Sequence, residues 1–288
     1  MKLSFSVWDN HLYKLLTIAF LKGCRNLNVR TGDAMFLGLW LLIIFTIIYE
    51  PIIGYFGYQR FKQNVKEKAD ARSKYYKNIM IGLWLPTLFI FLLVSLTGMN
   101  FRDIGITLPS IHTDTLGTVL TYSILLIGFL YISLMVYYLV GYQVSRKVRT
   151  KFIEAKEKEL NAASYSDILP VTNIEKKLWN YVSLTAGVTE EIIYRGFLIF
   201  AFSYLFPDLS IWAVIVLSSF LFGLAHTYQG VAGVIRTTIV GIIFSCLYIG
   251  MSSIIPLIII HFLIDYVSKL GDSKTNNFPH EEDIEIKK

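Results

Sequence analysis

The chain has 288 residues, of which 54% are hydrophobic and 17% are charged, and its net charge at pH 7 is +6. Soluble domains usually carry about 25% charged residues, so this composition excludes an ordinary soluble domain and indicates a polytopic membrane protein. The positive charge is then a topology signal, and we expect no nucleic-acid partner. The two cysteines, Cys24 and Cys246, predict neither a disulfide framework nor a thiolate zinc site.

The N-terminal segment has an apolar stretch at residues 15–21 that is too short to cross a bilayer, and we expect it to lie in the interface. Runs of about the length needed to span follow at residues 34–55, 79–98, 116–140, 179–206, 209–226, 231–250 and 254–270. The prediction is an all-α polytopic membrane bundle of about seven transmembrane helices, within a range of six to eight.

Positive charge gathers in two loops of this predicted bundle. Residues 54–77 contain seven Lys or Arg and residues 142–177 contain eight, whereas residues 99–115 between them contain only Arg102. The positive-inside rule places both basic loops and the C-terminal tail in the cytoplasm. Seven spans would put the N-terminus outside, against the five Lys or Arg in residues 1–30, so the side of the N-terminus stays open.

Three charged residues, Glu190, Glu191 and Arg195, lie in the middle of the fourth apolar run. A charge at the centre of a membrane helix costs about 2.5–3.5 kcal/mol, so such residues mark a functional site by default. Glu191 and Arg195 are four residues apart and should form an ion pair on one helix face. Glu190 then points elsewhere as an unpaired carboxylate that could exchange protons with water. The alternative is a purely structural charge cluster that locks helices together.

A second polar position, His226, ends the next apolar run after Phe222. Glu190 lies 17 residues before Pro207 and His226 lies 17 residues after Leu209. At 1.5 Å per residue both are about 25 Å from the same turn, so we expect them at matching depth on neighbouring antiparallel helices. The alternative is a histidine buried for structural reasons.

The third pair, His261 and Asp265, is again four residues apart and should share one helix face. Its alternative reading is a self-satisfied pair, but polar groups in hydrocarbon usually find partners on neighbouring helices. His261 lies only about 12 Å past the turn at residues 252–253. Placing it level with Glu190 therefore requires that turn to be buried or the helix to be tilted.

The combined set of a carboxylate, two histidines and an acidic partner allows several chemistries. It can activate water and stabilise an oxyanion, or Glu190, His226 and His261 could hold a divalent metal such as zinc. Either arrangement can hydrolyse a peptide bond. A proton-coupled transporter would use similar residues, but it should also show broken helices in paired halves, and the sequence has no such repeat.

Taken in order, these motifs resemble those of the CPBP family, the CAAX prenyl endopeptidases and bacteriocin-processing or immunity proteins. The matching pattern is EExxxR at Glu190, FxxxH ending at His226, and HxxxD starting at His261. The family often has asparagine where this chain has Asp265, and a carboxylate can donate a hydrogen bond to an oxyanion only when it is protonated.

The resemblance implies an intramembrane endopeptidase whose first-motif glutamate activates water, assisted by the second-motif histidine, while the third motif stabilises the oxyanion. It divides the chain into residues 1–174 (interfacial segment, about three transmembrane helices and basic loops), a four-helix protease core at 175–270 and a polar, disordered tail at 271–288. Glu190 is about 17 Å from Trp179, which marks the cytoplasmic boundary. We therefore expect membrane-bound peptide substrates, cut near the cytoplasmic face of a bacterial plasma membrane. A non-catalytic immunity or scaffold protein is the alternative function.

Overall fold

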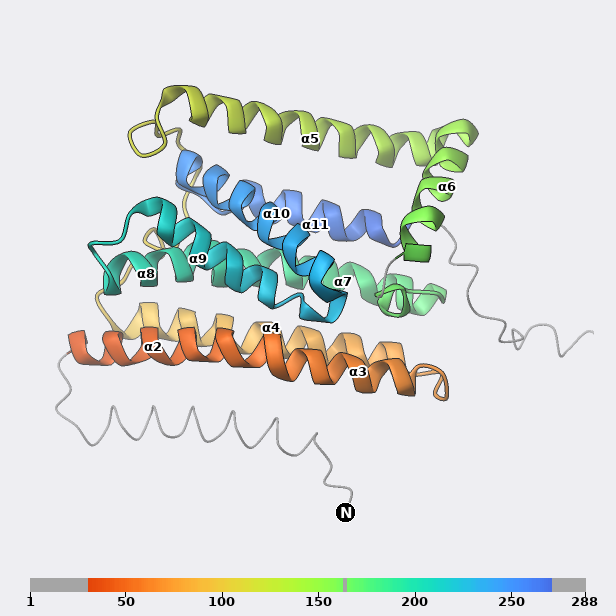
Figure 1. Cartoon of the computed structure of the whole chain (residues 1–288), viewed down its shortest axis with the longest axis horizontal. Helices are drawn as coiled ribbons and strands as arrows, with labels where there is room; N and C mark the ends of the chain where they lie inside the picture. The colour runs from red at the N-terminus through yellow and green to blue at the C-terminus, as the bar shows by residue number, and fades with distance from the viewer. Residues whose placement is uncertain (1–30, 163–164, 271–288) are drawn as a thin grey trace, which may run out of the picture.

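The computed structural model describes residues 31–162 and 165–270, and every regular element in this part of the chain is helical. Long helices lie side by side with their axes roughly along one direction (Figure 1). This arrangement confirms the predicted all-α bundle. The interfacial segment expected at residues 15–21 and the tail expected at 271–288 lie outside the described residues.

The first helical run changes from α-helix to π-helix and back without a break. It consists of α2 (Thr31–Ile48), η1 (Tyr49–Gly54) and α3 (Tyr55–Asn64). Pro51 lies inside η1 and has no N–H to donate to the preceding turn, which is a recognised cause of a local change in helix geometry. The chain then forms α4 (Ala71–Leu96), α5 (Thr118–Val144) and α6 (Arg146–Ala162).

The second half of the chain forms α7 (Asn173–Glu190), η3 (Glu191–Leu198), α8 (Ile199–Leu205), α9 (Ile211–Leu224), η4 (Thr227–Gln229), α10 (Gly230–Met251) and α11 (Ile255–Ser268), after a short helical turn η2 (Ser166–Ile168). The start of α7 is a capping box. The Thr172 side chain accepts the backbone N–H of Glu175 at 3.2 Å, and the Glu175 carboxylate accepts the backbone N–H of Thr172 at 2.8 Å.

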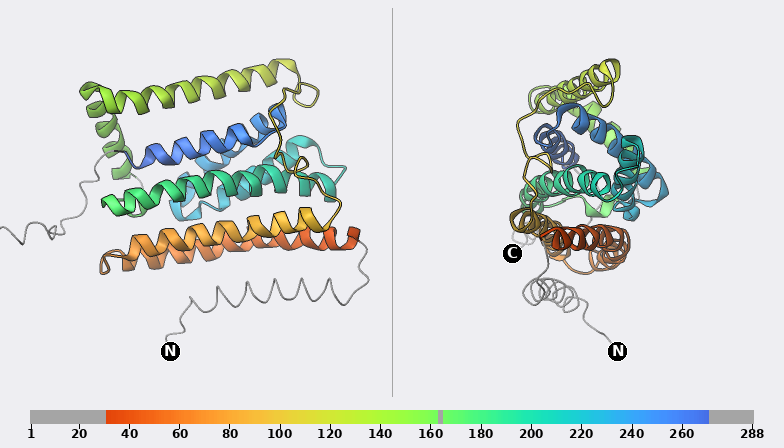
Figure 2. Two further views of the ribbon diagram at one scale, coloured as in Figure 1. Left: turned by 180° about the vertical axis from the view of Figure 1, so that it is seen from behind. Right: turned by 90° about the vertical axis from the view of Figure 1, so that its left-hand side faces the viewer.

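Helix α7 lies in the middle of the bundle, between α4 and α11, and these three helices are closely packed. The continuous run α2–α3 lies beyond α4, and α5 lies beyond α10 and α11 (Figures 1 and 2). Helix α6 runs across one end of the bundle, nearly perpendicular to the long helices. Residues of α7 can therefore contact both α4 and α11.

Among the described residues, four helical runs are long and apolar enough to cross a membrane by length and composition: Gly32–Asn64, Ala71–Leu96, Thr118–Val144 and Thr227–Met251. Helices α9 and α11 are shorter apolar helices, and the α7–η3–α8 run carries the charged cluster. Each of the seven expected spans thus falls on a helix or helical run. On α5 only 11% of the apolar window is buried, so most of its surface is available to lipid.

The expected span at residues 209–226 is longer than the helix that forms there. Helix α9 ends at Leu224, and His226 lies in the turn that follows, with its backbone N–H bonded to the Gly223 carbonyl at 2.9 Å. Gly230 adopts a φ of 79°, a left-handed conformation that L side chains avoid, and it directs the chain back into α10. His226 is therefore held by a turn rather than by a continuing helix.

The turn between α10 and α11 is buried, as the expected depth of His261 requires. Ser253 is fully buried, and its hydroxyl donates to the Thr107 carbonyl at 2.6 Å. The backbone N–H of Ile254 donates to the Gly105 carbonyl at 3.0 Å. The loop between α4 and α5 therefore covers this turn and lets α11 begin inside the bundle.

Candidate active site

The charged cluster lies where α7 changes into the π-helix η3. Glu190 is the last residue of α7, and Glu191 and Arg195 belong to η3. Nη1 of Arg195 lies 2.9 Å from Oε1 of Glu191, and both side chains are almost completely buried. The predicted ion pair is present. Short π-helical segments occur frequently at functional sites, and this one holds the first motif.

Glu190 points away from that ion pair, as the sequence predicted. Its Oε2 atom is buried and has no hydrogen-bond partner among the described residues. The side chain lines a cavity that also contains His226. Nε2 of His261 lies 3.8 Å from this Oε2 atom, which is an electrostatic contact rather than a hydrogen bond. Glu190 is therefore the carboxylate of the cluster that faces open space.

His261 links the first and third motifs. Its Nδ1 atom lies 2.6 Å from Oε1 of Glu191, whereas its Nε2 atom lies 3.9 Å from Oδ2 of Asp265. The partner expected on an earlier helix is thus Glu191. The alternative of a self-satisfied His261–Asp265 pair is not what the structure shows, because Asp265 is the more distant of the two. Three carboxylates, Glu190, Glu191 and Asp265, surround this imidazole, so it is placed to exchange a proton with them.

A close approach of α7 and α11 makes this contact possible. A Cβ atom on Gly187 would lie 3.0 Å from the backbone nitrogen of Phe262 and 3.1 Å from the carbonyl oxygen of Ile258. Only glycine leaves room for the backbones at this crossing. The indole N–H of Trp179 donates to the Asp265 carbonyl at 2.9 Å and fixes the other end of the same pair of helices.

The second motif contributes an aromatic ring and an imidazole. The ring of Phe222 lies 4.1 Å from the Arg195 guanidinium, and Phe244 lies on it at 5.1 Å, so two rings contact this buried cation. Nδ1 of His226 lies 2.9 Å from the Phe222 carbonyl oxygen. His226 and Glu190 line the same cavity, which supports the depth match expected from counting residues.

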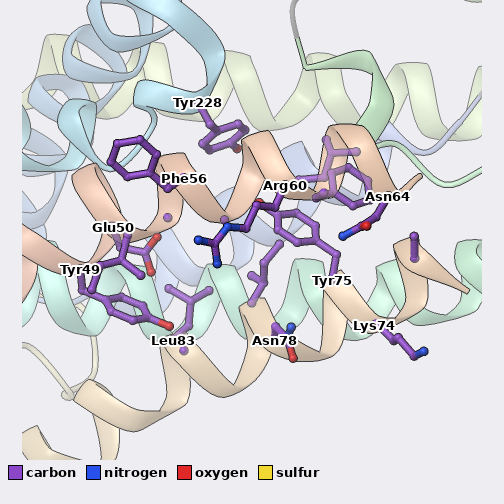
Figure 3. A pocket seen from close by; sticks show the side chains of 18 of the residues that line it. Tyr49, Glu50, Phe56, Arg60, Asn64, Lys74, Tyr75, Asn78, Leu83 and Tyr228 are labelled. Atoms are coloured by element: carbon purple, nitrogen blue, oxygen red, sulfur yellow. The ribbon is translucent and has the colours of Figure 1, made fainter. Parts of the chain in front are cut away.

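The cavity has a volume of about 480 Å³ and lies between the first two helical runs and the motif residues. Figure 3 shows Glu50 and Tyr228 among the side chains that point into it. The sequence analysis did not single out either residue. The signal for Glu50 was available, because it is a carboxylate in an apolar run, as Glu190 is, and it stands directly before Pro51.

The grouping of the motif side chains decides whether they could hold a metal ion. Within residues 31–162 and 165–270, no three His, Cys, Asp or Glu side chains are grouped so that they could bind one. Nδ1 of His226 faces the Phe222 carbonyl and Nδ1 of His261 faces Glu191, so Nε2 is the atom of each ring that is left for a further partner. The zinc site considered from the sequence is not formed by the described residues.

Residues 176–267 match the family model described as type II CAAX prenyl endopeptidase Rce1-like. No curated protein and no solved structure matches the chain. The matched segment contains all three motifs, from Glu190 on α7 to Asp265 on α11, and the helices that carry them meet at one site. Over residues 176–267 the chain is therefore similar to the Rce1-like type II CAAX prenyl endopeptidases, which supports the resemblance of its three motifs to the CPBP intramembrane proteases.

Proposed function

We propose that the protein is an intramembrane endopeptidase in which Glu190 activates a water molecule for attack on a peptide bond. The observation that carries this proposal is the position of Glu190, whose buried Oε2 atom has no hydrogen-bond partner among the described residues and whose side chain faces a cavity shared with His226. A carboxylate that is positioned by its neighbours but not neutralised by them suits a general base.

The remaining motif residues receive roles from their contacts. Glu190 takes a proton from water while the water oxygen attacks the scissile carbonyl, and His226 assists on the same cavity wall. When the tetrahedral intermediate collapses, the C–N bond breaks and Glu190 passes the proton to the leaving amine. Glu191 orients the His261 ring through Nδ1, so Nε2, which faces Glu190 at 3.8 Å and Asp265 at 3.9 Å, can donate to the oxyanion that forms. Glu191 contacts both Arg195 and His261 and so holds η3, which directly follows Glu190, against α11.

The substrate in this proposal is a membrane-tethered peptide, lipid-anchored or bacteriocin-related, cut near the cytoplasmic interface of a bacterial plasma membrane. The rim of the cavity includes Asn64, Lys68 and Asp70, in and beside the basic α3–α4 turn that the positive-inside rule places in the cytoplasm. A peptide held by the bilayer can reach a cavity at this depth, whereas a folded soluble protein cannot. Efficient cleavage of soluble folded substrates alone would overturn this part of the proposal.

Comparing protein termini in cells with wild type, with no protein, or with Glu190→Gln tests the activity. We expect a set of new termini that depends on wild type and is missing in the Glu190→Gln cells, while the variant accumulates in the membrane at the wild-type level. Glu67→Gln, an exposed glutamate outside the cavity, is the matched control and should behave as wild type. Termini that persist in the Glu190→Gln cells would remove the mechanism.

A non-catalytic immunity or scaffold role is the second candidate, because the same contacts also hold helices together. Glu191 links η3 to His261 of α11, and Arg195 contacts Phe222 of α9. Expression of wild type and Glu190→Gln in a bacteriocin-sensitive strain separates the two roles. Equal protection by both would support a binding role, whereas protection by the wild type alone would support proteolysis.

A further inference from the structure

A second glutamate, Glu50, faces the cavity from the side opposite the motifs. It belongs to the π-helix η1 on the first helical run, whereas Glu190 is the last residue before the π-helix η3. Both side chains line the same cavity, although 140 residues separate them in the sequence. The matched family segment begins at residue 176, so Glu50 lies outside it.

Glu50 has no partner in the described part of the chain. Its carboxylate forms no hydrogen bond or ion pair with a described residue. It lies in the middle of a membrane-length helix, where a charged group costs about 2.5–3.5 kcal/mol unless something neutralises it. Its side chain is directed into the cavity rather than toward another helix (Figure 3). A group from outside the chain that enters this cavity can therefore supply the missing partner.

Charge is distributed unevenly along the cavity. The cationic side chains Lys68 and Lys74 are exposed to water and salt, and Lys74 is paired with Asp70 at 2.6 Å, whereas the Arg60 guanidinium lies between Glu50 and Tyr75 (Figure 3). The two partly buried carboxylates, Glu50 and Glu190, are at the inner end. Aromatic side chains also line the cavity, with Tyr49 and Phe56 next to Glu50 and Tyr75 on the other side of Arg60 (Figure 3). Carboxylates and aromatic faces together favour a cation.

We propose that Glu50 is a substrate-binding residue that pairs with a lysine or arginine side chain of the peptide, next to the bond that faces Glu190. This inference rests on the proposed function and specifies its substrate class as a peptide with a basic residue close to the cleavage site. The cation would form a charge-assisted hydrogen bond with Glu50 in a space of low water content, where such bonds are strongest.

The test measures binding, so that it does not depend on turnover. Full-length Glu190→Gln protein in lipid nanodiscs is titrated with pools of lipid-anchored hexapeptides of mixed sequence. One position is fixed as Lys in the first pool, as Gln in the second and as Glu in the third, and each position is scanned in turn. The same titrations are made with Glu50→Gln, Glu50→Lys and Glu67→Gln added to the Glu190→Gln protein.

We expect one position at which the Lys pool binds about tenfold or more tightly than the Gln pool, as a hydrogen bond to a charged group would give. With Glu50→Gln, the Lys and Gln pools should bind with about equal affinity. With Glu50→Lys, the Glu pool should bind most tightly, and with the control Glu67→Gln the preference for the Lys pool should persist. Equal binding of the three pools, or a Lys preference that survives Glu50→Gln, overturns the inference. The proposed function is tested by a different experiment, and it fails if wild-type cells contain no protein termini that depend on Glu190.

Discussion

Oε1 of Glu191 lies 2.6 Å from Nδ1 of His261, and the same oxygen also accepts from Arg195 at 2.9 Å. One buried oxygen therefore joins the first and third motifs across two helices. Because the side chain of Glu191 is completely buried, its charge is neutralised by these two partners rather than by water. The geometry separates the two adjacent glutamates into one that holds the site together and one that faces the cavity.

Glu191→Gln should destabilise the protein as well as reduce activity, because it leaves Arg195 as a buried cation without its carboxylate. Removing one partner of a buried pair costs about 3–5 kcal/mol. Thermal unfolding in detergent and membrane abundance should both fall relative to Glu190→Gln. In a double-mutant cycle, Glu191→Gln with Arg195→Met should recover part of the stability. Additive losses would show that the pair is not coupled.

Gly187→Ala should reduce activity by separating α7 from α11. The added Cβ atom would lie 3.0–3.1 Å from backbone atoms of α11, which cannot rotate away as a side chain can. Strain of this kind costs about 1–3 kcal/mol, and a shift of α11 also moves His261 away from Glu191. Gly98→Ala is the matched control, since a Cβ there has no neighbour within 4 Å. Wild-type activity and stability in Gly187→Ala would contradict the close crossing.

Phe222→Leu should destabilise the site, because leucine keeps the position apolar but has no aromatic ring to stack on the Arg195 guanidinium. Losing the ring contact at 4.1 Å, together with imperfect repacking, should cost about 1–3 kcal/mol. Phe220→Leu is the matched control, because Phe220 is 49% exposed on the same helix and faces away from the core. If both variants unfold at the same temperature, the stacking contact contributes nothing measurable.

The α3–α4 turn should face the cytoplasm and the α4–α5 loop should face the opposite side. These segments lie at opposite ends of the bundle, and seven Lys or Arg fall in residues 54–77. In a Cys24→Ser background, Ala69→Cys should react with an impermeant thiol reagent only after the cells are permeabilised. Leu108→Cys, at a position that is 81% exposed, should react in intact cells. The reverse pattern would invert the topology.

Residue spacing was enough to predict the local features of this site. The pairing of Glu191 with Arg195 follows from helical periodicity, and the shared cavity of Glu190 and His226 follows from counting along two helices joined by a short turn. Counting also required a buried turn before His261, and Ser253 is fully buried. These positions could be predicted because each depends on the geometry of a single helix or of a single short connection between two helices.

The contacts between distant helices could not be predicted in the same way. The rotation of α11 relative to η3 decides that Glu191, and not Asp265, is the closer partner of His261, and no local pattern fixes this rotation. The stacking of Phe222 on Arg195 has the same origin. Glu50 was missed for another reason, since its partners in the cavity are far away in the sequence and its own segment reads as an ordinary span.

The π-helical segment η3 also makes chain length a constraint on the site. Successive residues of a helix are about 100° apart around its axis, so deleting one residue from 192–198 would turn the two ends of this segment relative to each other. Either Glu190 would turn away from the wall it shares with His226, or α8 would lose its packing on α9. A substitution can be absorbed by neighbouring side chains, but a shortened backbone cannot, so the number of residues between Glu190 and α8 is as much a part of this site as their identity.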